Sequence, residues 1–532
     1  FGITWPFDDS YPYGPFANGD FWVAGPVTII QISPASIISG TRTMHGSMIN
    51  PSPRSGQIQG YDSAMYGDFG PYFDAALNVA RPNQQDLSAL NPLLVPANSS
   101  LVSSISVPQA GALPQFQTAA ILTVLPAPPP AGSFRPAYSG NDKTIRFNRS
   151  QLNHALLSRL PPVSGTPDLA AVERLFERPW LDHVPNWPAR FLHPLDNMPD
   201  YGREMSTQMG IGALMLHLNF SDAAKETLLV RFVQLGIDLY GVAQDGGNHN
   251  WPPAGGQTSG RKWPILFAGL LLNDAAMRGI GPGNGTGAVE FSEDGQTFFV
   301  TQADIERSHA PDTRGCYAEE YTQADLGLAE WGISHSTEPA GDNRPWCAAY
   351  RQCCTATAWA GFVLAAHIMN ATDDWQHDAL FDYQDRYMAT EPHEGYRCWD
   401  PFTEAIRTAR EIRAEIVFAE PDFGPRPHLP DRAPDPYSVR HLGLERYVEA
   451  YRVYPQPRSA AIDAHAAGIA WKLQGADPMA SVFVVLSLNL LDPVLDAMEQ
   501  PQAQPAARVS RAGVELLNPH PRCLAEIAIE YP

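Results

Sequence analysis

Residues 221–242, SDAAKETLLVRFVQLGIDLYGV, contain the clearest structural pattern in the sequence. Their apolar side chains recur at spacings of three and four residues: Leu228, Phe232, Leu235, Leu239 and Val242. Such spacing places side chains on one side of an α-helix, and Ser221 or Asp222 is suited to cap its N-terminus. The stretch therefore predicts a helix that buries one face in a core.

Helical periodicity recurs on both sides of this stretch. The spacing of apolar residues predicts further helices over 205–218, 263–277, 321–331, 355–369, 402–416 and 460–473. Several of these segments are apolar on more than one face, which is typical of helices buried between two concentric layers. The sequence therefore predicts a mainly α protein built as an (α/α) toroid or barrel.

The first 150 residues differ from the rest because they lack helical periodicity and are rich in Pro, Gly, Ser and aromatic residues. Segments 21–32 and 117–125 predict strands or extended arms, and 524–531 predicts a small C-terminal β element. We therefore expect three regions: β-rich N-terminal arms over 1–150, a barrel carrying the catalytic site over 151–475, and a C-terminal segment over 476–532 that could belong to the same domain.

The composition limits the classes of partner. With 44% hydrophobic and 17% charged residues among 532, the chain can bury a large core. It carries 36 Lys+Arg against 57 Asp+Glu, a net charge of −21, which argues against nucleic acid or an anionic membrane as the main partner. An anionic ligand would need a local basic cleft.

Two further expectations concern location. No apolar run approaches the ~18 residues that a membrane-spanning helix needs, so we expect no membrane insertion. The chain begins at Phe1, which predicts a mature secreted or periplasmic protein whose signal peptide has been removed. The sequence leaves the oligomeric state open.

The segment 245–263, DGGNHNWPPAGGQTSGRKW, is the most informative part for function. Its glycines and prolines exclude a helix, and loops of this kind carry binding groups. It gathers amides, an imidazole, an indole and two cations: Asn248, His249, Asn250, Trp251, Arg261 and Lys262. These groups could hydrogen-bond sugar hydroxyls, stack under a ring and pair with a carboxylate, so we predict a site for a charged sugar. A purely structural connector is the alternative.

A second cluster, DTRGCYAEEY at 312–321, places Arg314 close to Tyr317 and Tyr321. A guanidinium can stabilise a nearby phenolate, so either tyrosine is a candidate proton-transfer group, although such tyrosines often simply pack. Other loops that mix aromatic residues with Arg are candidates for lining a substrate cleft: Tyr201, Arg203, Arg344, Trp346 and Arg351. No pattern typical of a metal site or a nucleotide loop occurs, so we expect no metal and no cofactor.

Three strings resemble polysaccharide lyase family 38, which contains alginate and glucuronan lyases: FDDSYPYGPFANGDFWVAGPVTI at 7–29, GGNHNWPPAGGQTSGRKWPILFAG at 246–269, and YTQADLGLAEWGISH at 321–335. The resemblance implies an (α/α) barrel and an anionic polysaccharide substrate. It also implies a tyrosine that acts on the sugar with a histidine and an arginine nearby. The matching residues are His249, Arg314 and Tyr321, with Tyr317 as the alternate.

The reaction implied is β-elimination on a 4-linked uronic acid, in which the C5 proton is removed and the C4 oxygen leaves. Neutralisation of the carboxylate by His249 with Asn248 or Arg314 would make this proton more acidic. In mannuronate and glucuronate both groups lie on one side of the ring, so one tyrosine could serve as base and then as acid. A toroidal glycoside hydrolase with paired carboxylates and a non-catalytic glycan-binding protein are the alternatives.

Overall fold

The computed structural model describes these residues: 1–53, 59–64, 73–82, 87–110, 115–163, 165–184, 192–197, 203–246, 251–253, 255–281, 289–308, 321–331, 355–390, 402–403 and 405–406. Contacts divide the chain into two compact units, of which the first comprises Phe1–Pro161 and Pro167–Trp399. The second comprises Pro162–Thr166 and Asp400–Pro532. In the second unit the description covers only eight residues, so the architecture below is that of the first.

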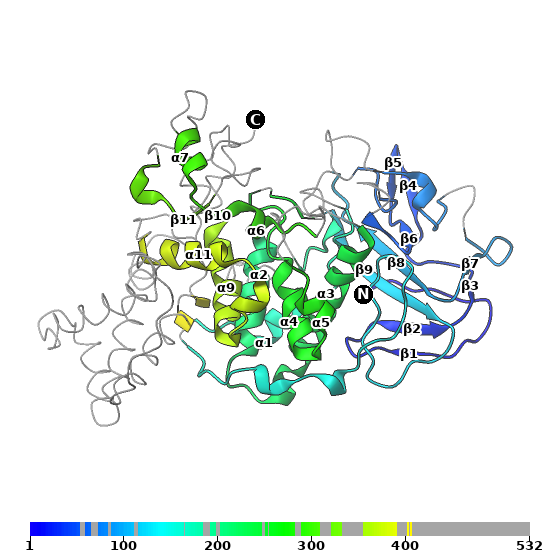
Figure 1. Ribbon diagram of the computed structural model, residues 1–532. Coiled ribbons are helices and arrows are strands. Elements are labelled where there is room, and N and C mark those ends of the chain that lie inside the picture. Colours follow the sequence, from blue (N-terminus) through cyan, green and yellow to red (C-terminus); the bar gives the residue numbers. More distant parts are fainter. Residues whose placement is uncertain are drawn as a thin grey trace, which may run out of the picture. The chain divides into compact units, whose positions relative to one another are not determined.

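A mixed five-stranded sheet organises the N-terminal part of the first unit (Figure 1). In spatial order its strands are β1 (Tyr13–Pro15), β2 (Phe21–Ala24), β9 (Phe116–Leu125), β8 (Ser99–Ser106) and β6 (Ser47–Ile49). The β2 and β9 strands run parallel, whereas the other neighbours are antiparallel. Nine of the ten β9 residues are buried, as expected for a central strand covered on both faces.

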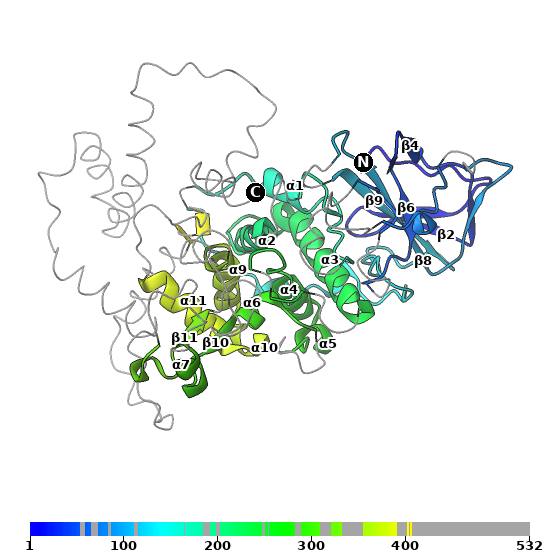
Figure 2. The same cartoon turned by 90° about the horizontal axis from the view of Figure 1, so that it is seen from above.

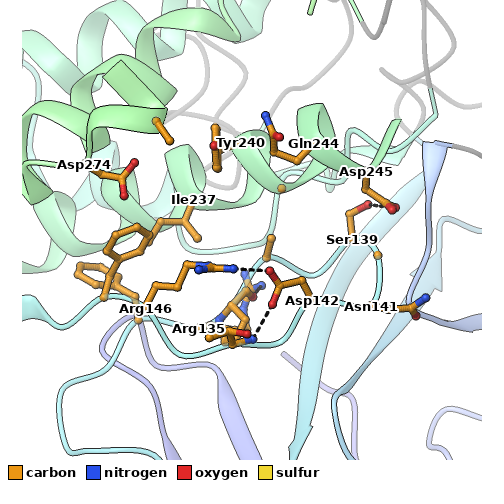
Figure 3. Close-up of a pocket in the computed structure, with 18 residues that line it drawn as sticks. Arg135, Ser139, Asn141, Asp142, Arg146, Ile237, Tyr240, Gln244, Asp245 and Asp274 are labelled. Atoms are coloured by element: carbon orange, nitrogen blue, oxygen red, sulfur yellow. Dashed lines mark hydrogen bonds and ion pairs between the residues drawn. The ribbon is translucent and has the colours of Figure 1, made fainter. Parts of the chain in front are cut away.

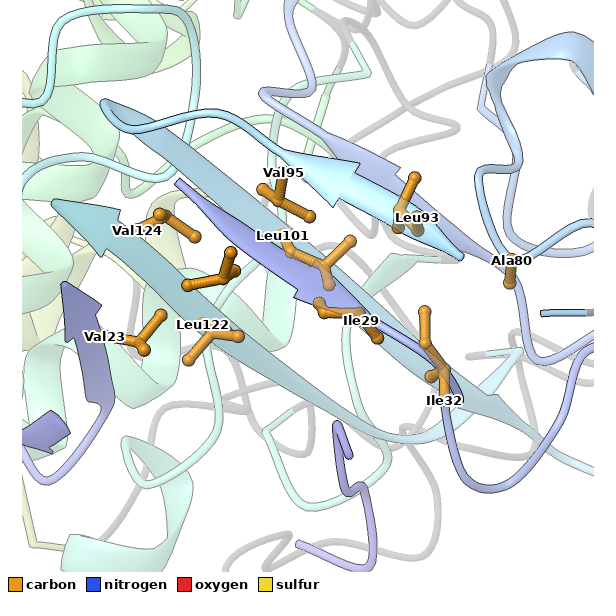
Figure 4. Close-up of a cluster of buried hydrophobic side chains, with 10 residues drawn as sticks. Val23, Ile29, Ile32, Ala80, Leu93, Val95, Leu101, Leu122 and Val124 are labelled. Atoms are coloured by element: carbon orange, nitrogen blue, oxygen red, sulfur yellow. The ribbon is translucent and has the colours of Figure 1, made fainter. Parts of the chain in front are cut away.

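Three two-stranded ribbons lie outside this sheet: β3 (Val27–Ile29) with β7 (Leu93–Val95), β4 (Ile37–Ser39) with β5 (Arg42–Met44), and β10 (Thr297–Phe299) with β11 (Ala329–Trp331). The β3–β7 ribbon packs on the five-stranded sheet through a hydrophobic cluster that Figure 4 shows. Ile29 and Val95 of the ribbon meet Leu101, Leu122 and Val124 of the sheet there. This core fixes the register of both layers, because a slip of one residue would turn the apolar side chains outward.

Ten α-helices lie in the described residues: α1 (Leu169–Leu175), α2 (Arg203–Leu216), α3 (Asp222–Gly246), α4 (Lys262–Leu272), α5 (Ala275–Arg278), α6 (Ser292–Gln296), α7 (Gln302–Ser308), α9 (Ala356–Met369), α10 (Thr372–Trp375) and α11 (Asp378–Thr390). Short 3-10 turns span Ala75–Leu77, Arg149–Gln151, His154–Leu156 and Gln323–Asp325. The views in Figures 1 and 2 show α2, α3, α4 and α9 grouped together.

Glycines allow two of these helix pairs to approach closely. A Cβ atom on Gly210 of α2 would lie 2.7 Å from the Cα of Gly361 in α9. A Cβ on Gly236 of α3 would lie 2.2 Å from the carbonyl oxygen of Pro264 in α4. Because no side chain fits at these distances, glycine is required for both crossings.

The expected mainly α toroid is wrong. The first unit has mixed α and β content, with the five-stranded sheet and ten helices in its described residues. Helices that are apolar on several faces predicted two concentric layers, but α2 is buried because it packs against α1, α3 and α9 together. The N-terminal segments, which were expected to be extended arms packed on a barrel, form a paired sheet with its own hydrophobic core.

Several of the individual helix predictions are confirmed. The helix over 221–242 is confirmed as α3, and the Ser221 hydroxyl accepts a hydrogen bond from the Ala224 amide at its N-terminus. Those over 205–218 and 355–369 are confirmed as α2 and α9, while that over 263–277 is broken at Asn273 into α4 and α5. The segments 460–473 and 524–531 lie outside the described residues.

The helix expected over Tyr321–Trp331 is wrong. The segment forms a 3-10 turn over Gln323–Asp325 and then strand β11. Gly327 between them has φ +83°, in the left-handed region that a continuous helix does not allow. The apolar spacing that predicted a helix therefore reflects a turn followed by a buried strand.

Candidate functional site

Asp182 joins both ends of the segment Trp251–Arg261, within the glycine-rich loop after α3. Its Oδ2 accepts a hydrogen bond from the Trp251 indole Nε1 at 3.0 Å and another from Arg261 Nε at 2.7 Å. Arg261 Nη2 also donates to Oδ1 at 3.2 Å. The three side chains are at most 1% exposed. One buried carboxylate thus ties two distant points of the loop to the protein interior.

The Arg261 guanidinium is fully engaged inside the protein. Besides Asp182, it donates through Nη1 to the carbonyls of Gln257 at 3.3 Å and Ser259 at 2.8 Å. Burial alone would raise the pKa of Asp182, but Arg261 and His193 outweigh this effect and hold that pKa below its usual value. Arg261, predicted to bind substrate carboxylates, therefore serves in this structure to hold the loop.

Two buried histidines adjoin this carboxylate. His193 Nε2 lies 3.7 Å from Asp182 Oδ1. His183 makes edge-to-face contacts with the rings of Tyr61 and Tyr138 at centroid distances of 5.8 and 5.7 Å. Burial lowers the pKa of His183 to about 3, and burial is also the main cause of the lowered pKa of His193. Burial thus favours the neutral form of both imidazoles.

The lowered pKa of His183 predicts acid destabilisation. Since its folded pKa lies below the unfolded value of ~6.5, the unfolded chain takes up the proton first as the pH falls, and stability present above that pH is lost. The contribution of His183 to the unfolding free energy should fall by about 1.4 kcal/mol per pH unit below ~6.5. Urea unfolding of the parent chain and of His183→Leu, measured between pH ~7.5 and ~4.5, should show a shallower loss in the variant.

The matched control for this prediction is His154→Leu, at a histidine that is only half-buried. Its pH dependence should follow that of the parent chain. Equal slopes for the parent chain and for His183→Leu would contradict the prediction.

Lys262 is also enclosed. Its Nζ donates to the Asp294 carboxylate and, at 2.6 Å, to the backbone carbonyl of Trp375. The same atom lies 5.1 Å from the centroid of the Trp375 ring and 5.5 Å from that of Phe291. Its side chain is 0% exposed. Lys262, also predicted to bind a substrate carboxylate, thus secures the start of α4 against α6 and α10.

Glu293, next to Asp294 in α6, was not singled out by the sequence. Its Oε2 accepts a hydrogen bond from the Gly260 amide at 3.1 Å, and the residue is 0% exposed. Burial, and after it the charge of Asp294, raises the pKa of Glu293 to about 7. This carboxyl therefore titrates close to neutral pH beside the glycine-rich loop.

The parent chain should lose stability as the pH rises towards neutral, and replacement of Glu293 by Gln should prevent this loss. The folded pKa of about 7 exceeds the unfolded value of ~4.3, so stability present below ~4.3 is lost as the pH rises through 7. As the pH is raised from ~5.5 to ~8, the unfolding free energy of Glu293→Gln minus that of the parent chain should increase by about 2 kcal/mol. Thermal and urea unfolding measure this, and the exposed Glu306→Gln should show no such gain.

Tyr321 lies in a small hydrophobic cluster with Val300 and Ile305, and it is 8% exposed. Arg203, at the start of α2, is 6% exposed. The structure thus brings Trp251 and Arg261 together, and it places Lys262 at Asp294 and Tyr321 in apolar packing. The other predicted site residues lie outside the described residues: Asn248, His249, Asn250, Tyr201, Arg314, Tyr317, Arg344, Trp346 and Arg351.

Comparison of the chain with models of protein families, with curated proteins and with solved structures gives no match. None of the described helices has the length and apolar character needed to cross a bilayer. Within the described ranges, no three His, Cys, Asp or Glu side chains are grouped so that they could hold a metal ion.

Proposed function

We propose that the chain is a polysaccharide lyase that cleaves a 4-linked uronic-acid polymer, mannuronan or glucuronan, by β-elimination. The observation that supports this proposal is the attachment of Trp251 and Arg261 to Asp182. Asn248, His249 and Asn250 directly precede Trp251 in the sequence. A catalytic loop must be held rigidly so that its groups keep their geometry, and a buried, charge-assisted contact can hold it in this way.

In this proposal the uronate carboxylate is neutralised by His249 with Asn248 or Arg314, which makes the C5 proton more acidic. A tyrosine removes that proton and then protonates the departing C4 oxygen. The burial of Tyr321 among apolar side chains favours Tyr317 for this role, because a proton-transfer group must reach the substrate. The protein would then be secreted or periplasmic, where such polymers occur.

Ultraviolet absorbance tests the proposal, since elimination creates a conjugated double bond. Polymannuronate, polyguluronate, glucuronan, hyaluronan and pectate form the substrate panel, with reducing ends measured in parallel. We expect absorbance to rise on mannuronan or glucuronan. Tyr317→Phe should lower the rate by about 10²–10⁴-fold if that tyrosine transfers the proton. His249→Ala is the second variant, and Tyr13→Phe, at an exposed residue of β1, is the matched control.

Three results would overturn the proposal. Reducing ends without absorbance would indicate a hydrolase, and binding without either signal would indicate a glycan-binding protein. Full activity in Tyr317→Phe and in Tyr321→Phe would remove the proposed proton-transfer group.

A further inference from the structure

A cavity of about 480 Å³ lies beside the C-terminal half of α3, among residues that the structure describes throughout. One wall is the segment 134–147 that follows the five-stranded sheet, and the other is the α3 face that carries Ile237, Tyr240 and Gln244. Asp274, just before α5, lies at one end (Figure 3). A volume of this size accommodates one or two sugar rings.

The segment 134–147 is held rigidly on its buried side. Arg135 is 1% exposed and donates to both oxygens of Asp238 in α3, at 2.8 and 2.6 Å. Lys143 Nζ donates to four successive backbone carbonyls, those of residues 137–140, at 2.8 to 3.1 Å. The Ser139 hydroxyl donates to Asp245 at 3.2 Å. The cavity wall is therefore preorganised, so a ligand would not have to order it.

Several polar groups at the cavity remain available to a ligand. Among the described residues, neither the Tyr240 hydroxyl nor the Gln244 amide forms a hydrogen bond within the protein. Arg146 uses one Nη for Asp142 and stays 57% exposed. In Figure 3, Tyr240 and Gln244 lie on the α3 side and Arg146 on the opposite wall. Donors and acceptors thus face the cavity from two sides.

Aromatic surface accompanies these polar groups. Phe147 and Tyr240 both line the cavity and are both half-buried. A half-buried aromatic ring offers an apolar face on which the C–H groups of a sugar can pack, while hydroxyls are bound by amide and guanidinium groups at the edge. This combination suits a hydroxyl-rich sugar ring that presents an apolar C–H face.

The charges select against an anionic sugar. The cavity lining contains two arginines and three carboxylates, Asp142, Asp245 and Asp274. Arg135 is paired with Asp238 and Asp20, and Arg146 with Asp142. Hydrogen bonds from Thr144, followed by Arg146, lower the pKa of Asp142 to about 2, so this carboxylate is ionised at neutral pH. No unpaired cation is left in the lining to neutralise a uronate.

We infer that this cavity binds an uncharged pyranose unit of a glycan, through Tyr240, Gln244 and Arg146. The inference goes beyond the proposed lyase activity and does not rest on it. It assigns the chain a second carbohydrate specificity, for a neutral sugar, at a site separate from the buried Asp182 cluster.

Saturation-transfer difference NMR on the full chain tests the inference with cellotriose as the neutral probe. Trimannuronate and the amino-sugar trimer chitosan triose serve as the anionic and cationic comparators. We expect cellotriose to bind and trimannuronate to bind at least ~10-fold more weakly. Loss of the Gln244 contact in Gln244→Ala should raise the dissociation constant by about 3-fold, and loss of both contacts in Tyr240→Phe combined with Gln244→Ala should raise it by about 10-fold.

The matched control is Tyr13→Ala, at a β1 tyrosine that is 71% exposed, and it should leave binding unchanged. Gln244 is exposed, so its substitution should not disturb folding. The inference is overturned if cellotriose does not bind, if both cavity variants bind it as the parent chain does, or if either charged trimer binds more tightly. Cellotriose has no carboxylate and cannot undergo the elimination, so this result is independent of the lyase assay.

Discussion

Substitution of Asp182 by Asn is expected to lower the free energy of unfolding by about 3–5 kcal/mol. The change leaves the Arg261 guanidinium buried at 0% exposure without its counter-charge. It also weakens the acceptor for the Trp251 indole. Removing one member of a buried ion pair is costly because the remaining charge keeps its desolvation penalty. Urea unfolding followed by tryptophan fluorescence measures the loss.

Asp222→Asn is the matched control for Asp182→Asn. Asp222 also pairs with an arginine, Arg159, but the two side chains are 50% and 54% exposed. Solvent screens such a pair, and its removal should cost less than about 1 kcal/mol. If the two variants lost similar stability, the anchoring role of Asp182 would be wrong.

Asp182→Asn also bears on the proposed function. Should the attachment of Trp251 and Arg261 position the loop for catalysis, the folded fraction of Asp182→Asn would turn over uronan more slowly than the parent chain. Asp222→Asn would retain the parental rate. A loss of stability without any loss of activity per folded molecule would limit Asp182 to a structural role.

The sequence predicted the longer helices because their signal is local. The apolar stripe from Leu228 to Val242 and the capping Ser221 lie within one stretch of chain, and α3 forms as expected. Segments 21–32 and 117–125 likewise contain the strands that their composition indicated.

The arrangement of these elements could not be predicted because it depends on contacts between distant residues. Phe21 in β2 pairs with Leu122 in β9, a parallel pairing that no local pattern encodes. Because α2 is buried on several faces, its sequence is apolar on those faces. The same apolar pattern would occur whether the neighbouring helices form a ring or a layer. Helix hydrophobicity alone therefore predicts a toroid, and this prediction is wrong.

In the candidate site, too, the sequence indicates local features but not the contacts between distant residues. Trp251 and Arg261 stood out because their residue types are unusual in a loop rich in glycine. Asp182, which binds them both, precedes them by 69 and 79 residues and lies in the apolar string PWLDHV. A lone carboxylate inside such a string was the available signal, since an aspartate is rarely buried unless it is paired. Its partners become evident only in three dimensions.

Arg135→Met should cost the protein a similar amount, about 3–5 kcal/mol in unfolding free energy. Arg135 lies between two carboxylates, donating to Asp20 at 2.7 Å and to both oxygens of Asp238. It thereby links the turn before β2 to α3. Methionine fills much of the volume but leaves two buried acids without a cation. The exposed Arg159→Met, whose partner Asp222 is 50% exposed, should cost less than about 1 kcal/mol.

The pH dependence of Arg135→Met separates lost charge from lost packing. Burial already raises the folded pKa of Asp238 above its unfolded value of ~3.9, and loss of the guanidinium should raise it further, so stability present at low pH is lost as the pH rises. The deficit of the variant should therefore be smaller near pH ~4.5 than near pH ~7.5. Arg135→Met combined with Asp238→Asn should recover part of the loss at neutral pH, because one unpaired buried charge is removed. A deficit that neither low pH nor the second substitution reduces would mean that Arg135 acts through packing, and the charge-based link between the sheet region and α3 would be wrong.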